Sequence, residues 1–251
     1  MLNQHTALVT GASRGIGQAA AVALARAGVR RLLLHYGSHR AGAEETLTQV
    51  RAAGSDGVIM GADLGTGAGI DALVEQVTPH AGSIEILVNN AGSLVERASL
   101  PEFTPALYDR VMNLNTRSVW FLTQCVAASM VAARRGAIIN VSSIAARTGG
   151  GPGAAVYAAA KAAVSAMTKG LAKELAPHGV RVNAISPGTV DNHFHQTFST
   201  REILDGVIRS TPQRRLSTNE DMADVIVFLA SDAARNIHGQ TIEINGGAYL
   251  I

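Results

Sequence analysis

Short apolar runs alternate with longer segments of helical spacing along the whole chain. The runs are rich in Val, Ile and Leu and occupy residues 6–10, 31–36, 57–61, 85–90, 137–143, 180–186 and 240–246. Runs that are apolar on both faces are typical of strands in a buried parallel sheet. The segments between them occupy residues 15–27, 41–53, 69–80, 107–133, 154–176 and 221–230. This alternation predicts an α/β fold, a doubly wound parallel sheet of seven strands with helices on both faces.

The same pattern predicts a single domain over residues 1–251, because neither a fixed repeat nor a Pro- or Ser-rich linker divides the sequence. The least regular stretch is polar and contains His193 and His195, and we expect residues 188–218 to form a lid over a site. The two histidines and Asp191 could bind a cation, but no further ligand accompanies them at a suitable spacing. We therefore expect no metal, and histidines that face a polar or anionic substrate.

Composition and charge exclude several classes of partner. Lys and Arg number 21 and Asp and Glu 19, and the basic residues are scattered, so we expect no nucleic-acid binding. The sequence shows neither a secretory signal pattern nor an apolar stretch of membrane-spanning length. Cys125 is the single cysteine, which excludes an internal disulfide and a cysteine-based zinc site. We expect a cytoplasmic protein without a membrane partner.

A glycine-rich loop follows the first predicted strand. It reads TGASRGIG from Thr10 to Gly17 and opens the first predicted helix. Gly11, Gly15 and Gly17 would allow a sharp turn, close approach of the backbone to a pyrophosphate, and tight packing of helix on strand. The helix N-terminus would add free N–H groups for the anion. A purely structural turn is the alternative, but the strand before and the helix after favour dinucleotide binding and a Rossmann-like fold.

A tyrosine and a lysine stand four residues apart in the alanine-rich stretch AAVYAAAKAAVSAMTKG. On a helix, Tyr157 and Lys161 share a face. A free phenol has a pKa near ~10, and lowering it to near ~7 takes roughly 4 kcal/mol. An adjacent ammonium and an oxidised nicotinamide would both act in that direction, so we expect a lowered pKa at Tyr157. The alternative is a half-packed tyrosine beside a surface lysine, but the glycine loop favours a catalytic pair.

These motifs together resemble the short-chain dehydrogenase/reductase family, in its 3-oxoacyl-(acyl-carrier-protein) reductase-like branch. The glycine loop, NNAG at residues 89–92, the Tyr157–Lys161 pair and INGG at residues 244–247 follow one another in the family's order, almost end to end. The resemblance implies an oxidoreductase that moves a hydride between a nicotinamide and a small-molecule carbonyl or secondary alcohol. It also implies a homotetramer with helices 107–133 and 154–176 at an interface. The alternatives are an NAD-dependent sugar or alcohol dehydrogenase and a non-catalytic dinucleotide-binding regulatory protein.

The resemblance implies that Ser143 is the serine that orients the substrate oxygen beside Tyr157. It is the second serine of a pair with Ser142, at the end of the fifth predicted strand. The interval from Ser143 to Tyr157 is one residue longer than is usual in the family. We attribute the difference to an extra residue in the loop RTGGGPGAA.

The resemblance also implies a catalytic asparagine, which aligns with Asn115 in RVMNLNTRSVWF. Asparagine is unfavourable inside a helix, so a special role is plausible there. The expected role is to hold a water that joins Lys161 to bulk solvent. Asn113 is the competing register, and a solvent-facing polar residue is the plain alternative.

The expected cofactor is NADP(H) rather than NAD(H). An NAD site usually has an acidic residue directly after the second strand, whereas this chain has Tyr36 there and its first following carboxylate is Glu44. Cations and hydroxyl groups suit a 2′-phosphate. The residues that we expect to receive it are Arg14, Ser38 and Arg40, with His39 beside them, and we expect Tyr36 to contact the cofactor as well. The alternative for Arg40 is an ordinary solvated arginine at a helix start.

The resemblance implies further cofactor contacts after each strand. Asp63 would reach the adenine amino group, or cap the next helix, and Leu64 would lie beside the ring. Val190 would bond the carboxamide through its backbone, and Asn192 would replace a threonine that is common in the family. The remaining residues expected to contact the cofactor are Gly11, Ser13, Gly15, Ile16, Gly17, Asn89, Ala91, Gly92, Lys161, Tyr157, Pro187 and Gly188. The alternative for Asn89 is that it mostly braces the sheet.

Overall fold

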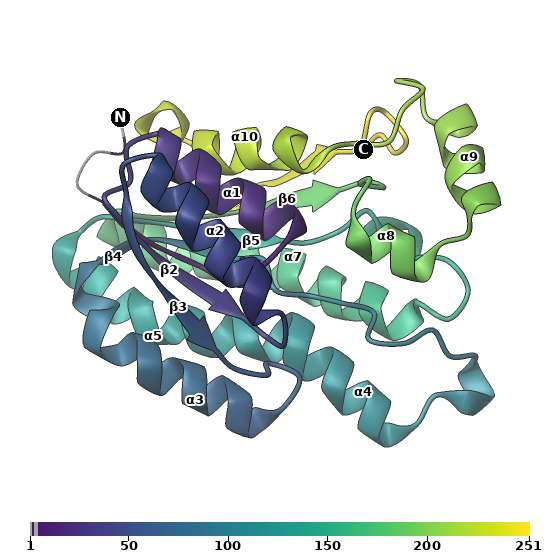
Figure 1. Cartoon of the computed structure of the whole chain (residues 1–251), viewed down its shortest axis with the longest axis horizontal. Helices are drawn as coiled ribbons and strands as arrows, with labels where there is room; N and C mark the ends of the chain where they lie inside the picture. Colours follow the sequence, from purple (N-terminus) through teal and green to yellow (C-terminus); the bar gives the residue numbers. More distant parts are fainter. Residues whose placement is uncertain (1, 3–4) are drawn as a thin grey trace.

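A computed structural model describes residues 2 and 5–251. Within them, one seven-stranded parallel sheet has the order β3-β2-β1-β4-β5-β6-β7 (Figure 1). The strands are β1 (Thr6–Val9), β2 (Arg31–Tyr36), β3 (Asp56–Gly61), β4 (Ile84–Asn89), β5 (Gly136–Val141), β6 (Val180–Pro187) and β7 (Thr241–Ile244). The predicted parallel sheet is confirmed, and every strand begins and ends within two residues of its expected bounds.

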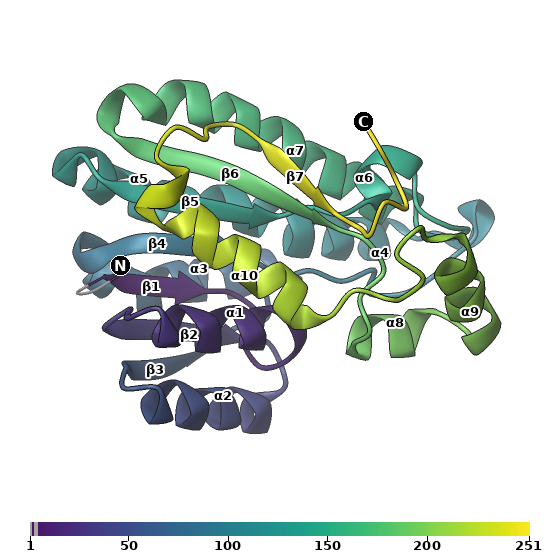
Figure 2. The ribbon, with the colours of Figure 1, turned by 90° about the horizontal axis from the view of Figure 1, so that it is seen from above.

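Helices cover both faces of the sheet, as predicted. One face carries α1 (Gly15–Arg26), α2 (Arg40–Ala52) and α10 (Asn219–Ala230). The opposite face carries α3 (Gly67–Val77), α5 (Ser118–Ala133) and α7 (Ala155–Leu175), with α4 (Pro105–Met112) leading into α5 (Figures 1 and 2). None of these helices, nor any other in the described residues, is long and apolar enough to cross a membrane.

The strand side chains divide between two buried clusters because successive residues of a strand point to opposite faces. Leu32 and Leu34 join the cluster under α1, α2 and α10, whereas Leu33 joins the one under α3, α5 and α7. Val9 and Leu8 divide in the same way. Each fully buried leucine contributes about 2 kcal/mol. A sheet covered on both faces therefore needs the uninterrupted apolar runs from which it was predicted.

The chain order creates a crevice at the carboxyl ends of the strands, where the order reverses between β1 and β4. The chain passes from the central strand β1 out to β3, returns to β4 beside β1, and continues to β7 at the other edge. Ligands of open parallel sheets bind at the carboxyl ends of the strands near such a reversal. Two short helices of the expected lid segment, α8 (His193–Phe198) and α9 (Arg201–Ser210), lie beyond those ends (Figure 2).

The helix expected over residues 107–133 is not continuous. α4 ends at Met112, a π-helical turn covers Asn113–Arg117, and α5 begins at Ser118. Helix α6 (Ala145–Thr148) was not expected either. The 3₁₀ turns that sequence periodicity also missed are Thr78–Ser83, Leu100–Glu102, Ala176–His178 and Asp232–Ala234. Single π turns are frequent at functional sites, and this one places Asn115.

Candidate active site

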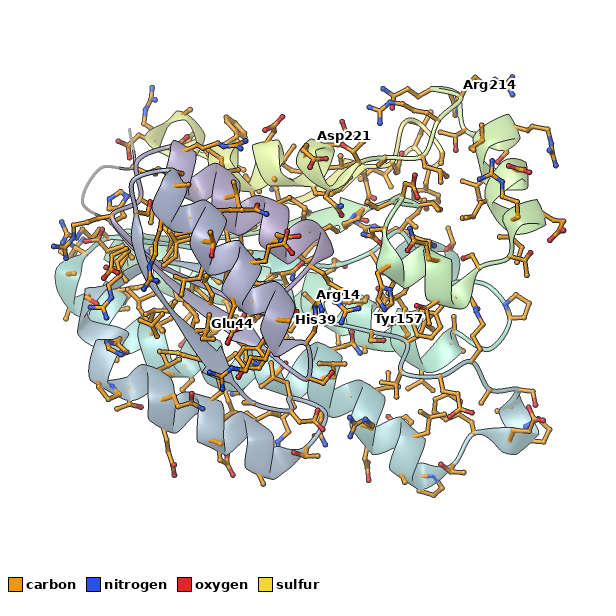
Figure 3. All side chains as sticks on the ribbon, in the orientation of Figure 1. Arg14, His39, Glu44, Tyr157, Arg214 and Asp221 are labelled. Carbon is orange, nitrogen blue, oxygen red and sulfur yellow. The ribbon has the colours of Figure 1, made fainter. Side chains whose placement is uncertain are left out.

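A pocket of about 650 Å³ opens at the carboxyl ends of the strands. The predicted residues that line it are Gly11, Ser13, Arg14, Gly15, Ile16, Ser38, Ala91, Gly92, Ser143, Tyr157, Lys161, Pro187, Gly188, Val190 and Asn192. The predicted residues that do not line it are Gly17, Tyr36, Arg40, Asp63, Leu64, Asn89 and Asn115. In Figure 3, Arg14 at the start of α1 and Tyr157 on α7 lie at this crevice, beside α8.

The glycine loop has the shape that a pyrophosphate requires. Gly11 and Gly15 have φ of +65° and +59°, in the left-handed region that favours glycine. A Cβ on Gly17 would lie 2.2 Å from the carbonyl oxygen of Gly11, so α1 packs directly against the loop. The N-terminus of α1 then presents free N–H groups and a favourable dipole to the pocket. This cradle fits the phosphates of a dinucleotide.

A buried histidine that the sequence analysis missed holds this loop in place. The backbone N–H of Gly11 donates to Nδ1 of His35 at 3.1 Å, and Nε2 donates to the carbonyl oxygen of Ala62 at 3.0 Å. Both bonds need the neutral ring with its proton on Nε2. Burial lowers the pKa of His35 to about 4. The contribution of neutral His35 to the stability of the fold is therefore complete above pH 6.5 and is lost as the pH falls toward 4.

Tyr157 and Lys161 lie on one face of α7, as predicted, and both reach the pocket. The Lys161 ammonium lies 5.8 Å from the centre of the Tyr157 ring and donates to the carbonyl oxygen of Val141 at 2.8 Å. Ser143 lines the same pocket, and its hydroxyl acts to lower the pKa of Tyr157. Ser143 and Tyr157 line the same pocket despite the longer interval between them, and Gly149, Gly150 and Gly153 in the intervening loop have positive φ.

Ser142, the other serine of the pair, has a different role. Its hydroxyl donates to the carbonyl oxygen of Lys161 at 2.9 Å and lies 2.7 Å from the hydroxyl of Ser165. Ser142 therefore braces α7, while Ser143 faces the phenol.

The pKa values of the two central groups depart from expectation. Burial raises the pKa of Tyr157 to about 12, and the hydrogen bond with Ser143 only partly opposes this. Burial lowers the pKa of Lys161 to about 8. Without a cofactor the pKa of Tyr157 is therefore raised rather than lowered, because burial disfavours the phenolate, and the lowering expected with an oxidised nicotinamide beside it stays a prediction. The phenol holds its proton at neutral pH.

Asn115 lies fully buried behind the pocket wall, at the π turn. Its side-chain nitrogen donates to the carbonyl oxygens of Ser93 and Val111, both at 2.8 Å, and its Oδ1 accepts from the N–H of Ser93 at 3.1 Å. The side chain thus ties the loop after β4 to the helix. A Cβ on Gly92 would lie 2.8 Å from both Asn115 Oδ1 and the Lys161 ammonium. The glycine leaves the space in which these two groups come together.

Asn89 faces away from the pocket and braces the sheet, which is the alternative to a cofactor contact. Its side-chain nitrogen donates to Asn140 at 2.9 Å and to Thr123 at 3.2 Å, inside the layer under α5. The next residue, Asn90, lines the pocket instead and donates to the carbonyl oxygen of Thr10 at 2.8 Å. Strand alternation explains the exchange, since neighbouring residues point to opposite faces.

Two contacts expected at the adenine are engaged elsewhere. The carboxylate of Asp63 accepts from Arg110 at 2.9 Å and from the backbone N–H of Gly65 at 3.0 Å. The side chain of Leu64 is buried in the core. Leu64 can therefore meet a nucleotide only through its backbone, and Asp63 only by sharing or releasing Arg110.

Of the residues expected near a 2′-phosphate, some line the pocket and others have partners elsewhere. Arg14 and Ser38 line the pocket. Arg40 instead donates to Glu44 at 2.8 Å on the solvent side of α2. The Tyr36 ring packs over Gly61, where a Cβ would lie 2.8 Å from its hydroxyl. Arg14 is the cation best placed for a phosphate.

Asn192 lines the pocket, but its side chain already has two partners. Its nitrogen donates to Asn219 at 3.0 Å, and its oxygen accepts from the N–H of Phe194 at 3.1 Å as the N-cap of α8. The residue expected to bond the cofactor therefore also connects the lid segment to α10.

Comparisons with known proteins agree with this geometry. Residues 11–249 match the family model of enoyl-(acyl carrier protein) reductase. The chain is 36% identical to the 3-oxoacyl-[acyl-carrier-protein] reductase FabG of Staphylococcus epidermidis, over 98% of this chain and 99% of that protein.

Solved structures are equally similar. The NADH-dependent reductase A1-R′, responsible for alginate metabolism, is 37% identical with a TM-score of 0.88, over 100% of this chain and 99% of that one. A protein from Beutenbergia cavernae, described as a candidate NAD(P)-dependent gluconate 5-dehydrogenase and holding NADP, is 34% identical with a TM-score of 0.91, over 98% and 97%.

Gly92→Ala tests the packing at the pocket wall. The new methyl group must displace the Lys161 ammonium or the Asn115 amide, so we expect NADPH binding, followed by its fluorescence, to weaken about tenfold. Gly170→Ala on the same helix as Lys161 is the matched control, because its Cβ meets no atom within 4 Å. Unchanged binding in Gly92→Ala would contradict the packing argument.

Proposed function

Because the chain belongs to the short-chain dehydrogenase/reductase family, we propose that Tyr157 is the acid–base catalyst of a hydride transfer, with Lys161, Ser143 and Asn115 in support. The protein is an NADP(H)-dependent oxidoreductase acting on a carbonyl or secondary alcohol. One observation supports this assignment of roles. Tyr157, Ser143 and Lys161 lie together in the pocket that begins at the glycine loop.

NADPH, when bound, supplies the hydride to the carbonyl carbon. The hydroxyls of Tyr157 and Ser143 donate to the carbonyl oxygen and stabilise the negative charge that develops on it. Tyr157 then gives its proton to that oxygen, which becomes the alcohol hydroxyl. A phenol that is protonated at neutral pH is in the form that reduction needs.

Lys161 and Asn115 act behind the phenol. The ammonium of Lys161 favours the phenolate left after proton transfer, and its bond to Val141 holds it in place. The Asn115 amide is occupied by Ser93 and Val111, so its contribution to proton movement would come through the backbone it exposes at the π turn.

We further propose that residues 188–218 form the substrate lid. Their apolar side chains Ile203, Leu204 and Val207 line the pocket, although α9 has no buried residue. An amphipathic helix with its apolar side over a pocket is suited to close on a substrate.

We also propose a homotetramer located in the cytoplasm. Large apolar side chains lie at the surface of the expected helical interface, with Tyr108, Trp120 and Phe121 exposed by 48%, 43% and 36%. Such patches are typical of protein interfaces. The free thiol of Cys125 suits a reducing compartment.

Tyr157→Phe tests the catalytic assignment. Removing the general acid should lower kcat for NADPH-dependent carbonyl reduction by about 10³-fold, with NADPH affinity unchanged. The spectrophotometric assay uses a panel of ketones, keto sugars and acyl thioesters. Tyr108→Phe on α4 is the control. Rates near wild type in Tyr157→Phe would remove the assignment, and a wild-type protein that binds NADPH but reduces nothing would favour a regulatory role.

Arg14→Ala tests the cofactor preference. A guanidinium that bonds the 2′-phosphate should contribute about tenfold or more to NADPH affinity and little to NADH affinity. Arg40→Ala should have a smaller effect, because Arg40 is 69% exposed and paired with Glu44. Calorimetric titrations of both nucleotides at fixed salt give the comparison. Equal losses for NADPH and NADH would contradict a phosphate contact at Arg14.

A further inference from the structure

Arg97 is a pocket residue that the hydride-transfer scheme leaves without a role. It follows β4 and joins two sides of the pocket mouth. Its Nε donates to the carbonyl oxygen of Phe198 at 2.9 Å, at the end of α8. Its Nη1 donates to the carbonyl oxygen of Pro152 at 2.6 Å, in the glycine-rich loop before α7. Two bonds from different segments fix the plane of the guanidinium.

The charge of Arg97 is not neutralised by these contacts. Both partners are uncharged carbonyl oxygens, and in the part of the chain that the structure describes no carboxylate lies within 4.0 Å of the guanidinium. Nη2 has no hydrogen-bond partner among those residues. An arginine in this position is prepared for a planar anion.

Arg97 and the Asp191 carboxylate are the charged groups that act on His195 at this end of the pocket. Burial lowers the pKa of His195 to about 4, the Arg97 charge adds to that effect, and Asp191 opposes it. His195 is therefore neutral at pH 7, and its Nδ1 lies 3.2 Å from the Ser199 hydroxyl. Asp191 does not line the pocket, so the charge that a ligand meets there is that of Arg97, which matches a monoanion better than a phosphate monoester with a charge of about −1.5 to −2.

Aromatic rings separate Arg97 from the reacting phenol. The Phe194 ring lies 5.8 Å from the Tyr157 ring and 5.1 Å from the Phe198 ring, centre to centre. Arg97 bonds the backbone of Phe198, so it stands at the outer end of the substrate half of the pocket. Thr148, Thr197 and Ser199 are among the hydroxyl-bearing side chains that line the pocket.

We propose that Arg97 binds the carboxylate of a small polyhydroxy acid whose keto or carbinol carbon lies at Tyr157. The inference rests on the proposed function and names its substrate class. A carboxylate would accept from the free edge of the guanidinium, and the hydroxyl groups of the acid would meet the threonine and serine side chains. Arg97 is exposed at the pocket mouth, so an uncharged acyl chain would leave the guanidinium to water and make no ion pair with it, whereas a carboxylate would.

The test compares sugar acids with sugar alcohols that differ only at one terminal carbon. The pairs are D-gluconate and D-glucitol, D-mannonate and D-mannitol, and D-galactonate and galactitol. Binding of each to the complex with NADP⁺ is measured by calorimetry. We expect at least one acid to bind about tenfold or more tightly than its alcohol. In Arg97→Gln that ratio should fall to about one, because glutamine keeps a donor but loses the charge.

Arg51→Gln removes an equal charge at the end of α2, away from the pocket, and should leave the ratio unchanged. A purely structural role of Arg97 as a connection between Phe198 and Pro152 would weaken both members of a pair equally, and that result overturns the proposal. So does a wild-type protein that prefers none of the acids. Failure of the hydride-transfer proposal would appear separately, as NADPH binding without reduction of any carbonyl, while the binding ratio stays measurable.

Discussion

The site is organised around one ammonium group that is almost completely removed from water. Lys161 is 2% exposed, and a buried cation without partners is costly. The carbonyl oxygen of Val141 supplies one hydrogen bond, and the absence of a side chain at Gly92 leaves the remaining space. These contacts only partly replace the water that the ammonium loses, so the pKa of Lys161 is lowered to about 8. A nearby phenolate would favour the ammonium, and a further positive charge would disfavour it. The ionisation of Lys161 is therefore coupled to that of Tyr157.

The parallel sheet explains how such distant residues meet. Strand β1 delivers the glycine loop, β4 delivers Gly92, β5 delivers Val141 and the two serines, and β6 delivers the turn at Pro187. Because parallel strands end at the same edge, these short segments converge without long loops. Helix α7 then needs only its four-residue spacing to bring Tyr157 and Lys161 to that edge. The fold fixes the positions, while local contacts adjust the electrostatics.

Sequence reasoning located the strands and most of the pocket for identifiable physical reasons. Strands covered on both faces need uninterrupted apolar runs, and the residues that follow them converge at one edge. The differences came from contacts that periodicity does not encode, and the cofactor contacts expected of these residues stay predictions. Arg40 took a partner one helical turn away, in Glu44. Asn90 rather than Asn89 faces the pocket, because neighbouring residues of a strand point to opposite faces of the sheet.

The remaining differences depend on three-dimensional burial. At the π turn, Asn115 bonds Ser93, a residue distant in the sequence. The sign of the pKa shift at Tyr157 depends on the balance between lost water and nearby charge, which no spacing reveals. His35 and Arg97 belong to no motif, and only their backbone partners identify them.

The central claim is that burial keeps the Tyr157 phenol protonated until a positive nicotinamide lies beside it. The direct measurement is a ¹³C NMR titration of the Tyr157 side chain, assigned with Tyr157→Phe, in the free protein and with saturating NADP⁺. We predict a pKa near 12 in the free protein and a lower value in the complex. A pKa of about 10 in the free protein that NADP⁺ leaves unchanged would contradict the account.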